Sequence, residues 1–373
     1  MFFLYEDLCS NFKIYIENKN VNNKLFLINY ITKIKELFIY SFENNKYEII
    51  KYAINNINPN IKKNYAIRYS VRYGYYKIVK LLLYHKRFYL NLNQMQLLIQ
   101  WACRNGHLKI VKLLLKDNPN KYILIEPFKW ACRNGHLKVV KLLFQYKQID
   151  PQFQLSYTSI YCHAYKWVCK NGYYKIIKYF WKTHKLKMQS EELINIISKK
   201  GYFKIAKLLF TNTPADPSND NNYAIRMACM NKHLKIIKLL LKDKRVDPSD
   251  CNNVAFLQAI KVGSYKVVKL LLKDKRVNPS VNNCAIRWAT VRGRYKIVEL
   301  LMKDKRVDPS DDDNFAIKAA SERGYYKIVE LLLKDKRVDP SADDNDAIKL
   351  AFKEGHTEIV NLLLKDKRVS LIK

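Results

Sequence analysis

The 373-residue sequence has few of the residues that divide a typical globular chain, with only nine glycines and ten prolines. It has no uncharged apolar run of about 18 residues, the minimum for a transmembrane helix. The first residues, Met1–Asp7, include two acids and no basic segment, so no secretory signal is expected. The eight cysteines include no CxxC pair, which argues against a zinc knuckle or a redox dithiol. We therefore expect an intracellular protein of the cytoplasm, including that of a host cell, with the nucleus left open.

Motifs for catalysis are also missing from the sequence. It contains no GxxxxGK[ST], GxGxxG, HExxH or GxSxG pattern. The one conceivable metal set, Cys162 and His163 with Cys169, lacks a fourth ligand at a usual spacing. We predict no catalytic residue, no metal site and no cofactor.

Positive charge dominates the composition, with 68 Lys and Arg against 33 Asp and Glu and a formal net charge of +35. Apolar residues make up 49%, which is typical of a folded protein. An excess of this size favours anionic partners. A coding bias towards Lys, Asn, Ile, Tyr and Phe is an alternative source of the lysines.

Every glycine precedes the same type of segment, as in the run from Tyr75 to Leu83. Two further copies carry Asn45 or Lys232 instead of glycine, and we call all eleven sites the glycine position. Successive glycine positions lie 29, 32, 29, 37, 29, 31, 31, 30, 31 and 31 residues apart. A period near 31 over eleven units predicts one solenoid rather than several globular domains. The glycines are Gly74, Gly106, Gly135, Gly172, Gly201, Gly263, Gly293, Gly324 and Gly355.

Each unit is predicted to consist of a helix, a turn, a second helix and a loop. In one unit, Asn314 is a candidate N-cap for the first helix, and Gly324 is expected to end that helix in a left-handed conformation. The second helix carries the apolar run from Ile328 to Leu333, and Asp339-Pro340 forms the turn that follows. Lys232 is expected to cost about 1–2 kcal/mol if it is left-handed, unless Asn231 takes that role.

Two segments, Gly106–Leu115 and Gly135–Leu143, resemble the second half of an ankyrin repeat, and the Trp-Ala-Cys-Arg-Asn before each resembles the end of its first helix. The resemblance covers roughly residues 33–370. The period is about 31 rather than 33, and the Thr-Pro-Leu-His opening of the family is replaced by runs such as that at Tyr223. The variant with Lys-Asp-Lys-Arg-Val-Asp-Pro-Ser resembles arrays common in large DNA viruses and their amoebal hosts.

The resemblance implies an all-α, ankyrin-type α-solenoid of about eleven helix-turn-helix repeats with short finger loops over residues 33–370. It also implies a non-enzymatic scaffold for protein–protein interaction, with the first helices on the concave, ligand-binding side. Residues 1–32 do not fit the repeat and are predicted to form an N-terminal helical cap. We expect a monomer.

The excess charge is concentrated in residues 63–210, which hold 28 basic and 5 acidic side chains. Residues 211–373 hold 32 basic and 22 acidic side chains, with acids in loops such as Asp311–Asp313. On the first helices, the sites six and two residues before the glycine position are four apart and share a face. Basic residues at these sites are predicted to line up as a ladder that binds an acidic protein. This basic ladder comprises Arg68, Arg72, Arg104, Lys129, Arg133, Lys166, Lys170 and Lys199.

The alternative function is electrostatic binding of nucleic acid or of an anionic membrane surface. A second row of lysines follows the second helices of the whole array and is interpreted as a solvated face. We call it the lysine stripe: Lys77, Lys109, Lys138, Lys175, Lys204, Lys235, Lys266, Lys296 and Lys327.

The step of 37 residues between Gly135 and Gly172 predicts an enlarged finger near residues 145–165. Tyr157, Tyr161 and Tyr165 in this segment are candidate contacts for a partner. The alternative is that these tyrosines pack the longer loop. Trp101, Trp130, Trp167 and Trp288, five residues before the glycine position, are interpreted as packing residues, as are the cysteines three residues before it.

Overall fold

The computed structural model describes residues 61–85, 88–116, 124–145, 158–184, 191–212, 215–280 and 283–369. The predicted cap of residues 1–32 and the first predicted repeat, around Asn45, lie outside these residues. The chain forms two compact units, residues 1–160 and 161–373. The described residues are helical, without strands, and fall into ten helix pairs.

The first helix of each pair ends just before the glycine position. The first helices are α4 (Ile61–Tyr73), α6 (Leu92–Asn105), α8 (Ile125–Arg133), α10 (Thr158–Lys170), α12 (Glu191–Lys200), α14 (Asn219–Met230), α16 (Asp250–Lys261), α18 (Cys284–Val291), α20 (Asp311–Glu322) and α22 (Ala342–Lys353). The second helices are α5 (Tyr76–Leu83), α7 (Leu108–Lys116), α9 (Leu137–Phe144), α11 (Tyr174–His184), α13 (Phe203–Asn212), α15 (Leu234–Leu240), α17 (Tyr265–Leu271), α19 (Tyr295–Met302), α21 (Tyr326–Leu332) and α23 (Thr357–Leu363).

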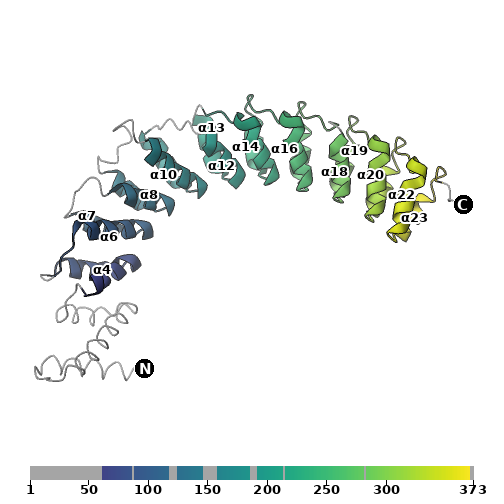
Figure 1. Cartoon of the computed structure of the whole chain (residues 1–373). Coiled ribbons are helices and arrows are strands. Elements are labelled where there is room, and N and C mark those ends of the chain that lie inside the picture. Colours follow the sequence, from purple (N-terminus) through teal and green to yellow (C-terminus); the bar gives the residue numbers. More distant parts are fainter. Residues whose placement is uncertain are drawn as a thin grey trace, which may run out of the picture. The chain divides into compact units, whose positions relative to one another are not determined.

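Within each unit the helices form two layers (Figure 1). In the first unit α6 contacts α4 and α8, and α7 contacts α5 and α9. In the second unit the first helices from α12 to α22 contact one another in chain order, and the second helices from α11 to α23 do the same. Helix-turn-helix repeats stacked side by side are what the glycine period predicts.

The core lies between the two layers, and both helices of a repeat contribute to it. The first helix α14 buries Ile225, Ala228 and Cys229, and the second helix α15 buries Ile236 and Ile237. The cysteines three residues before the glycine position are all buried, as predicted: Cys103, Cys132, Cys169 and Cys229. Burial raises the pKa of the Cys169 thiol to about 12, so this thiol stays protonated and packs as a small hydrophobe.

The glycine position is the main point of contact between consecutive repeats. At five described junctions the residue after the glycine position reaches back to the preceding repeat: His107 Nε2 donates to the carbonyl oxygen of Arg72 (3.0 Å), and His356 Nε2 donates to that of Glu322 (3.0 Å). His136, Tyr202 and His233 make the same contact.

The reaching side chain lies directly over the glycine of the preceding repeat. A Cβ atom at Gly324 would lie 2.7 Å from Cε1 of His356, and one at Gly74 would lie 2.6 Å from Cε1 of His107. The glycines are also left-handed, with φ of +72° at Gly324. Glycine is therefore required twice, for its backbone conformation and for the room it leaves.

Lys232 is the described exception to the glycine rule. It is left-handed, with φ of 60°, so Lys232 and not Asn231 takes this role. The residue that would reach back over it, in the next repeat, is Ser264. At the other described junctions, that residue is a His, Tyr or Arg. A side chain of two heavy atoms leaves room for the Cβ of Lys232.

In the C-terminal repeats, the loops that begin or end at Asp274, Asp304, Asp335 and Asp366 are each held by one arginine. Arg337 binds both carboxylate oxygens of Asp335 (3.0 and 2.7 Å), and its Nη1 donates to the carbonyl oxygen of Val307 in the preceding repeat (2.9 Å). Arg276, Arg306 and Arg368 repeat this arrangement. Much of the arginine in the C-terminal repeats is therefore used to join the repeats.

Asn314 plays a different part from the predicted one. Residues 312–314 are left-handed, with φ of 57°, 51° and 61°, so the right-handed part of α20 begins after Asn314. The Asn314 side chain makes no capping bond to its own helix and instead accepts from the backbone N–H of Asp339 in the next repeat (2.7 Å). The position of Asn314 in the repeat is therefore that of a second hydrogen bond between repeats. Asn suits this position because it tolerates the left-handed backbone region that the geometry needs.

We predict that Gly324→Ala lowers the free energy of unfolding by about 2–3 kcal/mol, because it adds left-handed strain and displaces His356. Gly355→Ala is the matched control: Gly355 has φ of +74°, but a Cβ there would have no neighbour within 4 Å. It should cost only about 1 kcal/mol. Urea unfolding measures the free energy of unfolding of both variants. In a His356→Ala background, most of the difference in cost between Gly324→Ala and Gly355→Ala should disappear. Equal costs for the two variants would contradict the role of the ring.

At the exceptional junction we predict that Lys232→Gly stabilises the protein by about 1 kcal/mol, because left-handed strain is removed. Ser264→His should destabilise the wild-type protein, since the ring would meet the Lys232 Cβ. In the Lys232→Gly background the same histidine should be tolerated. Thermal unfolding of the two single variants and the double variant tests this, and purely additive effects would refute the complementarity.

The Asp–Arg pairs predict a dependence of stability on pH. The hydrogen bonds from Arg337 lower the pKa of Asp335 below its usual value. The stability from this group is therefore present above the unfolded pKa of about 4 and is lost as the pH falls through the lower folded value. Asp335→Asn should destabilise the protein at neutral pH, and its gap from wild type in urea unfolding should narrow near pH 3. Asp344→Asn is the control, because exposed Asp344 joins no ion pair between described residues; at neutral pH it should destabilise the protein less than Asp335→Asn does.

Candidate interaction surface on the first helices

In the first unit, the basic ladder is interleaved with aromatic rings. The Arg68 guanidinium lies 5.1 Å from the centre of the Trp101 ring, and those of Arg104 and Arg133 lie 4.5 and 4.9 Å from that of Trp130. A cation at this distance from a ring face is attracted to it. Arg68 comes from α4, Trp101 and Arg104 from α6, and Trp130 and Arg133 from α8, so side chains from three consecutive first helices contribute to this surface.

The tryptophans differ in part from their interpretation as packing residues. Trp101, Trp130 and Trp167 are half-buried, and each lies under a basic side chain of the ladder. They belong to the same surface as the ladder because the site five residues before the glycine position adjoins the sites six and two before it. The sequence feature that indicates this combined surface is the shared register of Trp and Arg on the first helices.

Some ladder residues have acidic partners. Lys129 Nζ lies 2.7 Å from Glu126 Oε1 on its own helix, and Lys166 pairs with Glu192 at the start of α12. Arg68, Arg72 and Arg104 are exposed and join no ion pair between residues that the structure describes. Three arginines of the first unit are thus open to an external anion.

The ladder is divided between the two units, with Arg68 to Arg133 in the first and Lys166 to Lys199 in the second. In the second unit, exposed Lys170 lies 5.2 Å from the centre of the Trp167 ring, and Lys199 is exposed.

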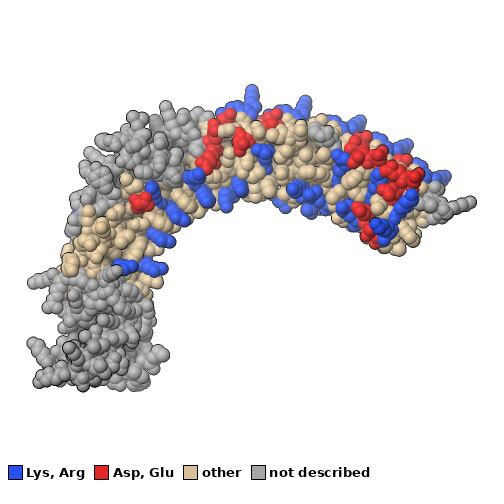
Figure 2. All heavy atoms as spheres, viewed as in Figure 1, with Lys and Arg blue, Asp and Glu red and all other residues tan. Residues whose placement is uncertain are grey.

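Two of the C-terminal repeats neutralise the equivalent site. Arg287 and Lys318, each six residues before its glycine, form ion pairs with Asp312 and Asp343 of the next repeat. Figure 2 shows acidic and basic side chains interleaved over this part of the second unit. The compensation predicted from the Asp-rich loops therefore has a structural basis, and it does not extend to the three open arginines of the first unit.

The lysine stripe is exposed at all nine of its positions, as expected for a solvated face. It lies on the second helices of both units. Because its lysines all occupy the same site of the repeat, the lysine stripe is a reference surface with which charge changes in the basic ladder can be compared.

The enlarged finger lies mostly outside the described residues. Tyr157 is outside them, and Tyr161 lies in α10 with its side chain outside the described part. The prediction for Tyr165 as a finger residue is wrong: it also lies in α10, is 6% exposed, and packs edge-on against Phe180 at 4.8 Å between ring centres. It is a core residue because it lies seven residues before Gly172, the site that buried Ile67 and Ile99 occupy in their repeats.

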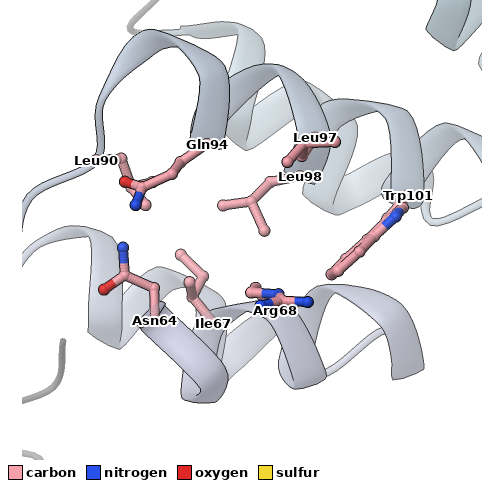
Figure 3. A pocket seen from close by; sticks show the side chains of 8 residues that line it. All are labelled: Asn64, Ile67, Arg68, Leu90, Gln94, Leu97, Leu98 and Trp101. Carbon is pink, nitrogen blue, oxygen red and sulfur yellow. The ribbon is translucent and has the colours of Figure 1, made fainter. Parts of the chain in front are cut away.

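A small pocket opens on the same surface of the first unit, between α4 and α6, with a volume of about 220 Å³. Its lining includes Arg68 and Trp101 at one end and Asn64 and Gln94 at the other (Figure 3). The sequence does not predict this pocket, because its apolar walls come from residues with the pattern of ordinary core residues.

No group of three or more His, Cys, Asp or Glu side chains suited to a metal ion is found among the described residues. The side chains of Cys162 and His163 lie outside them, and Cys169 is buried. None of the helices in the described ranges is both long and apolar enough to span a bilayer.

A family model for ankyrin repeats, in three copies, matches residues 37–123, 88–154, 193–283, 227–313 and 286–372. The chain belongs to the ankyrin-repeat family. The described helix pairs are thus an all-α, ankyrin-type solenoid, and ankyrin repeats indicate a scaffold for protein–protein interaction that is generally non-enzymatic. A search of curated proteins found no relative that matches this ankyrin-repeat chain.

Proposed function

We propose that this ankyrin-repeat protein is a non-enzymatic scaffold whose first-helix surface, basic in the central repeats, binds a protein with an acidic surface. The observation that supports this most directly is the contrast at one site of the repeat. In two C-terminal repeats this site is neutralised, at Arg287 by Asp312 and at Lys318 by Asp343, whereas Arg68 has no such acidic partner in the described residues. A uniform excess of lysine would not produce that difference.

Stacking on tryptophan supports a binding role for these arginines. A side chain held against a ring loses less conformational freedom on binding than one that moves freely in water. Arg and Trp are also the residues most enriched among those that dominate the energy of interfaces. The four side chains Arg68, Trp101, Arg104 and Trp130 give the first unit this composition.

Binding of nucleic acid or an anionic membrane surface is the second candidate. Half-buried Trp rings beside arginines could also stack on the bases of a single strand. This function predicts a steep loss of affinity with salt. We further propose that the protein acts as a monomer in a reducing compartment such as the cytoplasm, in keeping with its buried free thiols.

We predict that reversing three ladder charges together, by Arg72→Glu, Arg104→Glu and Arg133→Glu, lowers the affinity for a fluorescein-labelled glutamate-rich peptide by at least about tenfold, since each reversal replaces attraction with repulsion. Fluorescence anisotropy at two salt concentrations measures the affinity. The matched control reverses Lys77, Lys109 and Lys138 in the same repeats, which changes the net charge equally on the second helices.

Comparing the two triple variants separates the effect of where the reversed charges lie from the effect of the total charge. An equal loss of affinity in both triple variants would mean that only net charge matters and would overturn the ladder as a site. Labelled DNA and vesicles of anionic lipid are measured alongside. If DNA or vesicles bind more tightly than the peptide and lose affinity only in the ladder variant, the second candidate is the correct function. Circular dichroism confirms that each variant is folded.

A further inference from the structure

The pocket between α4 and α6 combines apolar walls with two different polar ends. Ile67 and Leu98 form buried walls, and Leu97 is 50% exposed at the surface. Figure 3 shows Asn64 and Gln94 at one end, with Arg68 and the Trp101 ring at the other. The pocket belongs wholly to the first unit and opens on the surface that carries the ladder.

The pocket lies where this repeat departs from the pattern of the others. In the second unit, the Asn ten residues before the glycine position binds the next finger: Asn222 Oδ1 accepts from Asp247 N–H (2.8 Å) and Asn314 Oδ1 from Asp339 N–H (2.7 Å). Asn64 has the same register and is also left-handed, with φ of 64°. The finger that follows it reads Phe-Tyr-Leu-Asn at residues 88–91 instead of Val-Asp-Pro-Ser.

The altered finger leaves Asn64 without its usual bond. Asn91 instead caps α6, accepting from Gln94 N–H (2.9 Å) while its own N–H donates to Gln94 Oε1 (3.0 Å). No hydrogen bond to the Asn64 side chain is found within the described ranges, although Asn64 is only 5% exposed. The Asn64 amide lines the pocket, so the pocket favours a ligand that supplies a hydrogen bond there.

We propose that this pocket holds one tyrosine side chain of the acidic partner. The ring would lie against Ile67, Leu97 and Leu98, and the hydroxyl would bond to the Asn64 amide, which can both donate and accept. Tyrosine has the apolar body and polar tip that this lining matches. Carboxylates beside the tyrosine would meet Arg68 and Arg72. The inference rests on the proposed function, because the acidic flanks are those of the same partner.

Synthetic peptides test this without altering the protein. A short fluorescein-labelled peptide of Glu and Gly carries a central Tyr, Phe or Ala, and anisotropy gives its affinity for the full chain. We expect Phe to bind about fivefold more weakly than Tyr, through loss of one hydrogen bond. Ala should bind about thirtyfold more weakly, through loss of the buried ring.

Two protein variants locate the effect. Leu97→Ala removes a wall and should weaken the Tyr peptide by about fivefold without changing the Ala peptide. Its matched control is Leu92→Ala, because Leu92 is also 50% exposed and on α6 but does not line the pocket. Asn64→Gly keeps the left-handed backbone and should abolish the preference for Tyr over Phe.

The outcomes distinguish this inference from the proposed function. If all three peptides bind equally and the reversal of Arg72, Arg104 and Arg133 still abolishes binding, the ladder stands and the tyrosine pocket is overturned. A pocket filled by another segment of the chain would give that same result. If Tyr and Phe bind equally but better than Ala, the assignment of the hydroxyl to Asn64 is overturned. If the charge reversal has no effect on any peptide, the proposed function itself fails.

Discussion

The contact on which this structure depends is a ring of one repeat placed over the glycine of the repeat before it. The glycine ends the first helix in a left-handed turn, and the His or Tyr of the next repeat crosses it to reach a backbone carbonyl. This carbonyl is one of those left unsatisfied at a helix C-terminus. One contact thus ends a helix, satisfies its backbone and fixes the register between repeats.

The fixed register decides which charges can act on a partner. Arginines of the fingers bind Asp and a neighbouring carbonyl, and cations of the C-terminal first helices bind the Asp of the next repeat. Both groups contribute to the net charge while being engaged within the chain. Arg68, Arg72 and Arg104 have no acidic partner in the described ranges, so the local surface of the first unit says more about a ligand than the total of +35.

Most of the fold was predictable because it follows from a repeated local pattern. The register of the glycines located the helix ends, and the apolar runs located the second helices. The role of Asn314 was not predictable, since its bond runs to Asp339 in another repeat and no local signal distinguishes this from capping. Tyr165 was predictable as a core residue, because it lies seven residues before Gly172 just as buried Ile99 lies seven residues before Gly106, and its assignment to the finger overlooked this register. The pocket between α4 and α6 was not predictable either, because its character depends on the absence of the usual hydrogen bond of Asn64. That absence becomes visible only when the repeats are compared in the structure.

The junction of Lys232 with Ser264 has a consequence for how such an array can change in length. Where a glycine meets a ring, unequal recombination between two repeats re-creates the same junction, so copies can be gained or lost without a clash. A crossover that joins the Lys232 repeat to any repeat beginning with His or Tyr would bring its Cβ against a ring. The repeats that carry Lys232 and Ser264 therefore fit each other as a pair, whereas a repeat that ends its first helix with glycine can precede any repeat that begins with His or Tyr.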